Sequence, residues 1–225
     1  VGKVVASIGP NNASVDWFRI SVHGKSAHVS TPHLGVDALY IASQIVVAIQ
    51  ALITRRTNPL ESILIGIGKL DAGTAYNVVA EEAAMEGTIR VFSPELRKAT
   101  KERIELVASS IAAMYGGTVS IEWKDFTSPL INDEESTLEV RKVLTSVFGK
   151  DSVVESRTPS LGGDDFAEYI LKVPGCYAFV GSRNPEVPET GVAHHNSHFD
   201  VDDGALSVMV NLMSSYAIEF LNGEV

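Results

Sequence analysis

Two hydrophobic periods alternate along the first half of the chain. Apolar residues at every second position predict four half-buried strands, over about 18–22, 63–67, 85–91 and 119–123. Apolar residues at helical spacing predict two helices between them, over about 36–55 and 94–114. The order strand, helix, strand, strand, helix, strand over residues 16–127 predicts a ferredoxin-like α+β domain, a four-stranded antiparallel sheet with two helices.

Beyond Ser128-Pro129 the pattern changes to helices that alternate with short apolar strands. The expected elements are a helix over 134–148, a strand at 153–154, a helix after Gly162-Gly163, a strand over 176–180 and a helix over 203–221. Such alternation is typical of an α/β layer. We therefore divide the chain into a linking segment at 1–15, the ferredoxin-like domain at 16–127, and part of an α/β domain at 128–225.

Composition narrows the function classes. With 225 residues, 45% of them apolar, the chain can bury one sizeable core or two modest ones, and it has no uninterrupted apolar run near the ~18 residues that span a bilayer. The net charge of -10 and the lack of Lys/Arg clusters argue against nucleic acid, because phosphate binding needs clustered positive charge. We expect small-molecule or protein partners and no membrane.

The single cysteine, Cys176, cannot form an internal disulfide, and it excludes a zinc site made of several thiolates. A reducing compartment, the cytoplasm, is the resulting expectation. The chain opens Val1-Gly2-Lys3, without an initiator Met or a charged-then-apolar leader. It therefore reads as a piece of a longer protein.

Two groups of histidines are candidates for chemistry. His28 and His33 lie between the first strand and the first helix, where a loop histidine can serve function or simply bond a nearby backbone group. His194, His195 and His198 fall within five residues, directly before the final helix. Such a cluster is either a metal candidate or a polar loop whose rings bond nearby acids.

Three further stretches carry polar groups with alternative explanations. Residues 160–169, Ser-Leu-Gly-Gly-Asp-Asp-Phe-Ala-Glu-Tyr, fit a flexible turn with an acidic helix start, which the helix dipole favours. Asn77 fits a turn cap, and it can also donate to and accept from a ligand. Arg90 fits a solvated strand position, and its guanidinium can also fork onto a carboxylate.

Three of these motifs resemble one family. Residues 24–37, Gly-Lys-Ser-Ala-His-Val-Ser-Thr-Pro-His-Leu-Gly-Val-Asp, resemble a signature of the M20 metallopeptidases and amidohydrolases, where it opens the dimerisation domain, or lid. Residues 193–203 are similar to the family's last metal-ligand motif, in which the ligand lies four residues before a Phe, here His195 before Phe199. Residues 160–169 are similar to a Gly-Ser-Glu-Asp-Phe segment of its aminoacylase and hippurate hydrolase branch, with Gly163 for Ser and Asp164 for Glu.

The resemblance implies an enzyme that hydrolyses the amide bond of an N-acyl amino acid, or of a small peptide-like substrate, with water activated by two divalent ions, Zn or Mn. It implies that His28 stabilises the oxyanion in the partner subunit's site, and that His195 binds metal. Asn77 and Arg90 would grip the polar end of the substrate, while Gly162 and Gly163 would line its pocket with backbone groups. His33 has only structural weight, and His194 and His198 would lie beside the ligand.

The family's other metal-ligand motifs, His-x-Asp and Glu-Glu, are absent from these residues. We expect them in a missing N-terminal catalytic segment, so that this chain supplies at most one metal ligand and is inactive alone. We also expect a homodimer formed through the lid. The alternative is a non-catalytic protein, a ferredoxin-like module that dimerises and binds a small carboxylate.

Overall fold

The computed structural model describes every residue from 1 to 225, and the chain divides into two compact units. One, which we call the sheet unit, comprises residues 12–129 and 160–165. The other, which we call the terminal unit because it holds both chain ends, comprises residues 1–11, 130–159 and 166–225. The chain thus passes from one unit to the other after residues 11, 129, 159 and 165.

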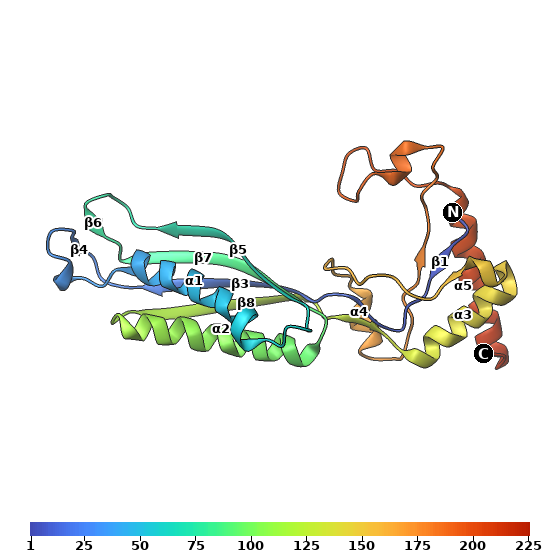
Figure 1. Ribbon diagram of the computed structural model, residues 1–225, viewed down its shortest axis with the longest axis horizontal. Helices are drawn as coiled ribbons and strands as arrows, with labels where there is room; N and C mark the ends of the chain where they lie inside the picture. The colour runs from blue at the N-terminus through green and yellow to red at the C-terminus, as the bar shows by residue number, and fades with distance from the viewer. The chain divides into compact units, whose positions relative to one another are not determined.

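Four antiparallel strands in the order β5-β7-β3-β8 form the sheet unit. They are β3 (Val15–His23), β5 (Ile63–Ala72), β7 (Glu82–Val91) and β8 (Thr118–Thr127). Helices α1 (Ala38–Arg56) and α2 (Pro94–Met114) lie along one face of this sheet (Figure 1). This arrangement confirms the predicted ferredoxin-like α+β fold, although the strands are longer than their apolar runs predicted.

The two faces of the sheet differ because side chains of a strand alternate between them. In β3, Phe18, Ile20 and Val22 are fully buried and pack with the helices in one core, while the residues between them are only half-buried. In β7 the same alternation buries Met85 and Ile89. The face away from the helices, which we call the open face, carries polar residues such as Arg19 and its cross-strand partner Glu86.

Local signals in the sequence set the helix ends. Asp37 caps α1, its carboxylate accepting from the backbone N–H groups of the next turn, and Ser93 caps α2, which has Pro94 at its first position. Asp133 caps α3 (Glu134–Phe148) by accepting from Ser136, and this lowers the pKa of Asp133. Each cap satisfies N–H groups that have no partner within the helix.

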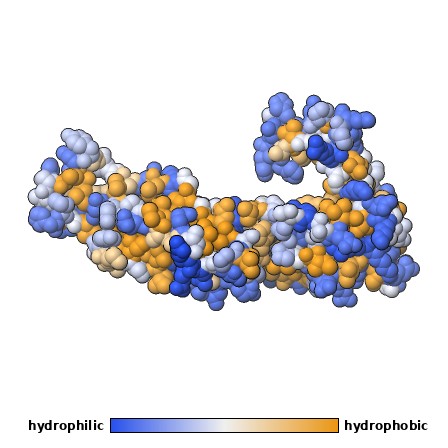
Figure 2. Space-filling model, in the orientation of Figure 1, coloured by the Kyte–Doolittle hydropathy of each residue, from blue (hydrophilic) through white to orange (hydrophobic).

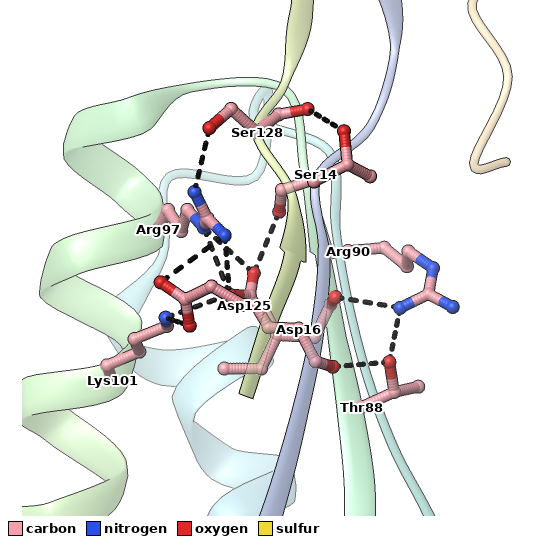
Figure 3. Close-up of polar contacts among 10 residues, drawn as sticks. Ser14, Asp16, Thr88, Arg90, Arg97, Lys101, Asp125 and Ser128 are labelled. Atoms are coloured by element: carbon pink, nitrogen blue, oxygen red, sulfur yellow. Dashed lines mark hydrogen bonds and ion pairs between the residues drawn. The ribbon is translucent and has the colours of Figure 1, made fainter. Parts of the chain in front are cut away.

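Asp16 interrupts the apolar pattern on the helix-facing side of β3, and its side chain is fully buried. The Arg97 guanidinium of α2 forks onto its carboxylate, with Nε at 3.0 Å and Nη2 at 2.8 Å, and Lys101 Nζ lies 2.8 Å away (Figure 3). Ser14 Oγ also donates to it at 3.0 Å. A buried carboxylate requires such compensation, so this cluster ties α2 to β3.

The terminal unit is a smaller α/β layer. Its central strand β1 (Val4–Val5) pairs in parallel with β10 (Val153–Val154) and antiparallel with β11 (Phe179–Val180). Helices α3 and α5 (Gly204–Asn222) pack against each other over a core that includes Val4, Leu144 and Leu212. The unit also contains a short helix, α4 (Phe166–Ile170). This confirms the predicted α/β part, with the strand expected over 176–180 reduced to its last two residues.

Short paired segments and turns complete the fold. They are β2 (Gly9–Asn12) with β9 (Leu130–Asn132), β4 (Ala27–His28) with β6 (Val78–Val79), and 3₁₀ turns at Pro32–Leu34, Lys150–Ser152 and Pro188–Gly191. The sequence pattern predicts neither short pair. A stretch of two to four residues holds too few positions to show a period.

Two helices, α1 and α5, are long and apolar enough to cross a membrane by length and composition alone. Helix α1 packs a stripe of six buried residues into the core of the sheet unit, as the core helix of a folded domain does. Helix α5 packs on α3 and β11 but buries only Ala205 and Leu212. Apolar side chains remain on the surface of the protein (Figure 2). Val47 in α1 and Met213 in α5 are among the exposed ones.

Candidate functional site

His28 and Asn77 lie side by side in a small ribbon beyond one end of the sheet. Strands β4 and β6 pair antiparallel, with His28 opposite Val78, and the Val29 N–H donates to the Asn77 carbonyl at 3.1 Å. The sequence places His28 in a loop, and the structure corrects this to a two-residue strand. The ribbon brings together two residues that are 49 positions apart, as counted from their numbers.

The glycines that bound this motif have a steric role. A Cβ on Gly24 would lie 2.2 Å from the Val36 carbonyl oxygen, and one on Gly35 would lie 2.8 Å from the Lys25 carbonyl oxygen. Lys25 and Val36 exchange two backbone hydrogen bonds of 2.8 Å, which hold the chain segments on either side of His28 together. Glycine therefore lets the backbone close behind His28.

The bonds of His28 fix the direction of its imidazole. Its Nδ1 accepts from the Ser30 backbone N–H at 3.1 Å and lies 2.7 Å from Ser30 Oγ. Since an acceptor nitrogen carries no proton, the neutral ring has its proton on Nε2. The exposed side chain thus presents an N–H donor to its surroundings. His33, in the adjacent 3₁₀ turn, is also exposed.

Arg90 lies on the open face of β7, toward the other end of the sheet. Its Nη1 donates to Thr88 Oγ1 and to the Ile89 carbonyl oxygen at 3.1 Å, which leaves Nε and Nη2 as the outward edge (Figure 3). Burial lowers the pKa of Arg90, while the nearby Asp16 carboxylate raises it. The effect of burial is the larger, so the pKa is lowered, but the guanidinium remains charged at neutral pH.

The ribbon and Arg90 are far apart within the sheet unit. His23 pairs with Glu82, and the Gly24 N–H donates to the Glu81 carbonyl at 2.7 Å, so the ribbon follows the Glu82 end of β7. Arg90 is eight residues further along that strand, and at 3.4 Å per residue this is about 27 Å. The structure therefore joins His28 with Asn77 and separates both from Arg90.

Gly162 and Gly163 lie at the Arg90 end of the sheet unit. The Ala13 N–H donates to the Ser160 carbonyl at 3.0 Å, and the Ser14 N–H donates to the Val91 carbonyl at 2.8 Å, so the segment 160–165 lies beside the end of β7. Thr127 Oγ1 also donates to the Asp164 carbonyl at 2.8 Å. The structure therefore places the double-glycine turn and Arg90 at the same end.

Gly163 leaves no room for a side chain. A Cβ there would lie 2.3 Å from Val15 Cγ2 and 2.6 Å from Thr127 Cγ2. These are closer than real Cβ contacts come, so Ser, the residue of the resembled motif, would require the segment to shift. At Gly162 the corresponding Cβ would be 3.3 Å from Ser160 Oγ, a tighter than usual contact with a movable side chain.

His195 lies in an exposed loop of the terminal unit, ahead of α5. It is the single non-glycine residue with a positive φ, 64°. Such a conformation costs about 1–3 kcal/mol and persists where the surrounding chain fixes it. Here Asn196 accepts from the His198 N–H through Oδ1 at 2.9 Å and from the Phe199 N–H through its carbonyl at 3.0 Å. The His194 ring packs on Phe199 at a centroid distance of 4.7 Å.

Asp202 holds the end of the same loop. Its N–H donates to the Ser182 carbonyl at 2.9 Å, and its carboxylate accepts from Asn184 Nδ2 at 2.7 Å and from the Gly204 N–H at 2.8 Å. The Asn184 bond, followed by the Gly204 bond, lowers the pKa of Asp202. No three His, Cys, Asp or Glu side chains in the chain are grouped so as to hold a metal ion.

Sequence reasoning missed two features around Arg90. Thr88, which binds its guanidinium, looks like any strand threonine. The Asp16 cluster behind it did leave a signal, because Asp16 has the parity of Phe18, Ile20 and Val22, and an acid on an apolar face needs buried partners.

Comparison with known proteins places these observations in a family. Residues 12–115 match the family model described as the peptidase dimerisation domain of M20 proteins. The chain is 35% identical over 206 residues to the N-acetyl-L-cysteine deacetylase of Bacillus subtilis (strain 168), covering 92% of this chain and 47% of that protein. It is 36% identical to thermostable carboxypeptidase 2 of Saccharolobus solfataricus, covering 95% of this chain and 53% of that protein.

A solved structure agrees with this match. The YxeP protein of Bacillus subtilis, described as a dinuclear metal-binding peptidase of the M20 family, superposes with a TM-score of 0.78 at 28% identity. The match covers 99% of this chain and 54% of that one. The chain spans about half the length of the curated relatives it matches. It belongs to the M20 family of metallopeptidases and amidohydrolases, with a peptidase dimerisation domain in its first half.

Proposed function

We propose that this chain supplies the dimerisation domain and one metal ligand of an enzyme that hydrolyses the amide bond of an N-acyl amino acid. The observation that carries the proposal is the outward edge of Arg90. Its Nη1 makes the contacts to Thr88 and Ile89, and Nε and Nη2 therefore remain available to a ligand. Two parallel N–H donors match a carboxylate. One relative is named for the deacetylation of N-acetyl-L-cysteine, an N-acyl amino acid, which carries that group.

His28 and Asn77 would act in the site of a partner subunit. They are about 27 Å along β7 from Arg90, so one sheet unit cannot apply all three to one small substrate. Exposed apolar side chains flank the ribbon, with Tyr76 98% and Leu34 59% exposed. A homodimer through the dimerisation domain would bring the ribbon of one subunit to the Arg90 end of the other.

In that site His28 would stabilise the oxyanion. The Nε2 proton, fixed by the Ser30 contact to Nδ1, is a donor for the negative charge that develops on the amide oxygen. Asn77 would bind the polar end of the substrate, and Gly162 and Gly163 would line the pocket with backbone groups. We assign no separate chemical step to His33.

His195 would be the metal ligand from this chain. An exposed imidazole in a constrained backbone suits that role, but a catalytic ion needs about three protein ligands, and the chain groups no such set. The remaining ligands would come from the half of the relatives that this chain does not span. Two divalent ions, Zn or Mn, would acidify the attacking water and polarise the amide carbonyl.

Mixing two inactive variants tests the proposal. In a full-length enzyme containing this chain, His28→Ala should lower turnover about 10²- to 10³-fold with metal retained, because one oxyanion donor is lost. His195→Ala should lose metal as well as activity. Mixed dimers of the two should recover activity, since one of their two sites contains both groups.

Two results would contradict the proposal. No recovery despite proven subunit exchange would show that His28 does not act across the interface. Binding of N-acyl amino acids without any hydrolysis would favour the alternative, a dimerising carboxylate-binding module.

The single cysteine is the support for a cytoplasmic location, which we propose with the activity.

A further inference from the structure

We infer that Thr88 is a positioning residue for Arg90 and sets which edge of the guanidinium meets the substrate carboxylate. This inference rests on the proposed function for its substrate. It extends that function, because it assigns a role to a side chain that contacts no substrate.

The Thr88 hydroxyl has a defined direction. Its Oγ1 donates its single proton to the Asp16 carbonyl at 2.6 Å, on the neighbouring strand β3. Both lone pairs of that oxygen remain to accept, and Arg90 Nη1 donates to it (Figure 3). The order of the bonds, from Arg90 to Thr88 to the Asp16 carbonyl, is therefore determined.

Asp16, whose carbonyl accepts the last of these bonds, is held firmly in place. Asp16 is fully buried, and its carboxylate is held on the other side of the sheet by Arg97 and Lys101. Arg90 lies on the open face, while this cluster lies on the helix face (Figure 3). The carbonyl that orients Thr88 thus belongs to a buried residue whose side chain is itself held by two cations.

The two protons of Nη1 are both used, one on Thr88 and one on the Ile89 carbonyl. The edge formed by Nε and Nη2 is then the edge that can fork onto a ligand. The same chain shows this geometry, because Arg97 binds the Asp16 carboxylate through Nε at 3.0 Å and Nη2 at 2.8 Å. Thr88 holds Arg90 ready for the same contact with a substrate carboxylate.

The kinetic test compares Thr88→Val, which keeps the shape but removes the hydroxyl, with Thr88→Ser, which keeps the hydroxyl. In the full-length enzyme Thr88→Val should raise KM for an N-acetyl amino acid about 3- to 10-fold, the value of one hydrogen bond, with kcat nearly unchanged. Thr88→Ser should restore KM. Ser21→Ala, which removes an open-face hydroxyl with no hydrogen bond, is the matched control and should leave KM unchanged.

A second comparison measures KM with a substrate that has no carboxylate. With the N-acetyl amino acid amide, which has no carboxylate, Thr88→Val and the wild type should have equal KM. A rise of the same size with both substrates would mean general damage to the site and would overturn the positioning role. An unchanged KM with the carboxylate substrate would overturn it too.

Side-chain NMR separates this inference from the proposed function. In the 225-residue chain the Arg90 Nε–H signal, identified by its absence from Arg90→Lys, should become more mobile in Thr88→Val but not in Thr88→Ser. Equal mobility in all three would refute the positioning role, whatever the enzyme hydrolyses. If the wild-type enzyme hydrolyses no N-acyl amino acid, the proposed function fails, and the NMR comparison still decides whether Thr88 holds Arg90.

Discussion

Replacing Asp16 by Asn should destabilise the sheet unit without changing its shape. The amide keeps the size of the carboxylate but removes the charge that faces Arg97 and Lys101, whose side chains are only 15% and 18% exposed. Removing one partner of a buried ion pair costs about 3–5 kcal/mol, because the remaining charge stays buried. We expect the lower end, about 3 kcal/mol, because Asp125 still pairs with both cations and compensates part of their charge.

Urea unfolding followed by tryptophan fluorescence measures this loss. The two tryptophans, Trp17 and Trp123, both lie in the sheet unit and report on that unit alone. With a denaturant slope of about 2 kcal/mol per molar, a loss of 3 kcal/mol lowers the midpoint by roughly 1.5 M. An unchanged slope would show that both proteins unfold from the same compact state.

Asp125→Asn is the matched control. Asp125 binds the same Lys101, but its side chain is 56% exposed, and exposed ion pairs contribute about 0–1 kcal/mol. Burial raises the pKa of Asp125, but Lys101 and Arg97 together outweigh it and leave that pKa below its usual value. Equal losses for the two variants, or a loss below about 1 kcal/mol for Asp16→Asn, would refute the reasoning from burial.

Further predictions address activity, assembly, backbone and pH. The 225-residue chain should show no amidohydrolase turnover with Zn or Mn in an acylase assay, because one ligand cannot hold a catalytic ion. It should sediment as a dimer at tens of micromolar, and a monomer there would count against pairing through the sheet unit alone. Gly24→Ala should lower stability by about 1–3 kcal/mol because of the close Val36 oxygen, while Gly66→Ala, with its nearest neighbour at 3.7 Å, should cost less in the same melts. Burial, with the Glu139 contact, raises the pKa of Tyr216 to about 12, so stability from this group is full below about pH 10 and is lost as the pH rises through 12. Absorbance titration should show a late-titrating tyrosine that Glu139→Gln shifts to lower pH.

The long elements could be predicted because their periods repeat many times. The apolar stripe of α1 and the alternation in β3 and β7 specify both the element and the face that it buries. The ribbon that pairs His28 with Val78, next to Asn77, could not be predicted, because its strands have two residues each and are distant from each other in sequence. Its existence depends on where the larger sheet ends.

Of the candidate site, residue types could be predicted but distances could not. The chemistry of Arg90 and His195 follows from the side chains and from the family motifs. The separation of Arg90 from His28 needs the register of β7 against β3, and the orientation of Arg90 needs a hydroxyl from Thr88 two positions earlier. The roles assigned to all six site residues stay predictions until the variants are measured.

Segment 160–165 has a consequence for domain exchange. Although the terminal-unit residues 130–159 separate it in sequence from the rest of the sheet unit, it contacts that unit, where Ser160 accepts from Ala13, and Gly163 fits between Val15 and Thr127. A recombinant domain cut at residues 12 and 129 would lack this segment and would expose two methyl groups that it now covers. A chimaera between relatives should therefore transfer both pieces together, and a graft of the continuous piece alone should fold less stably.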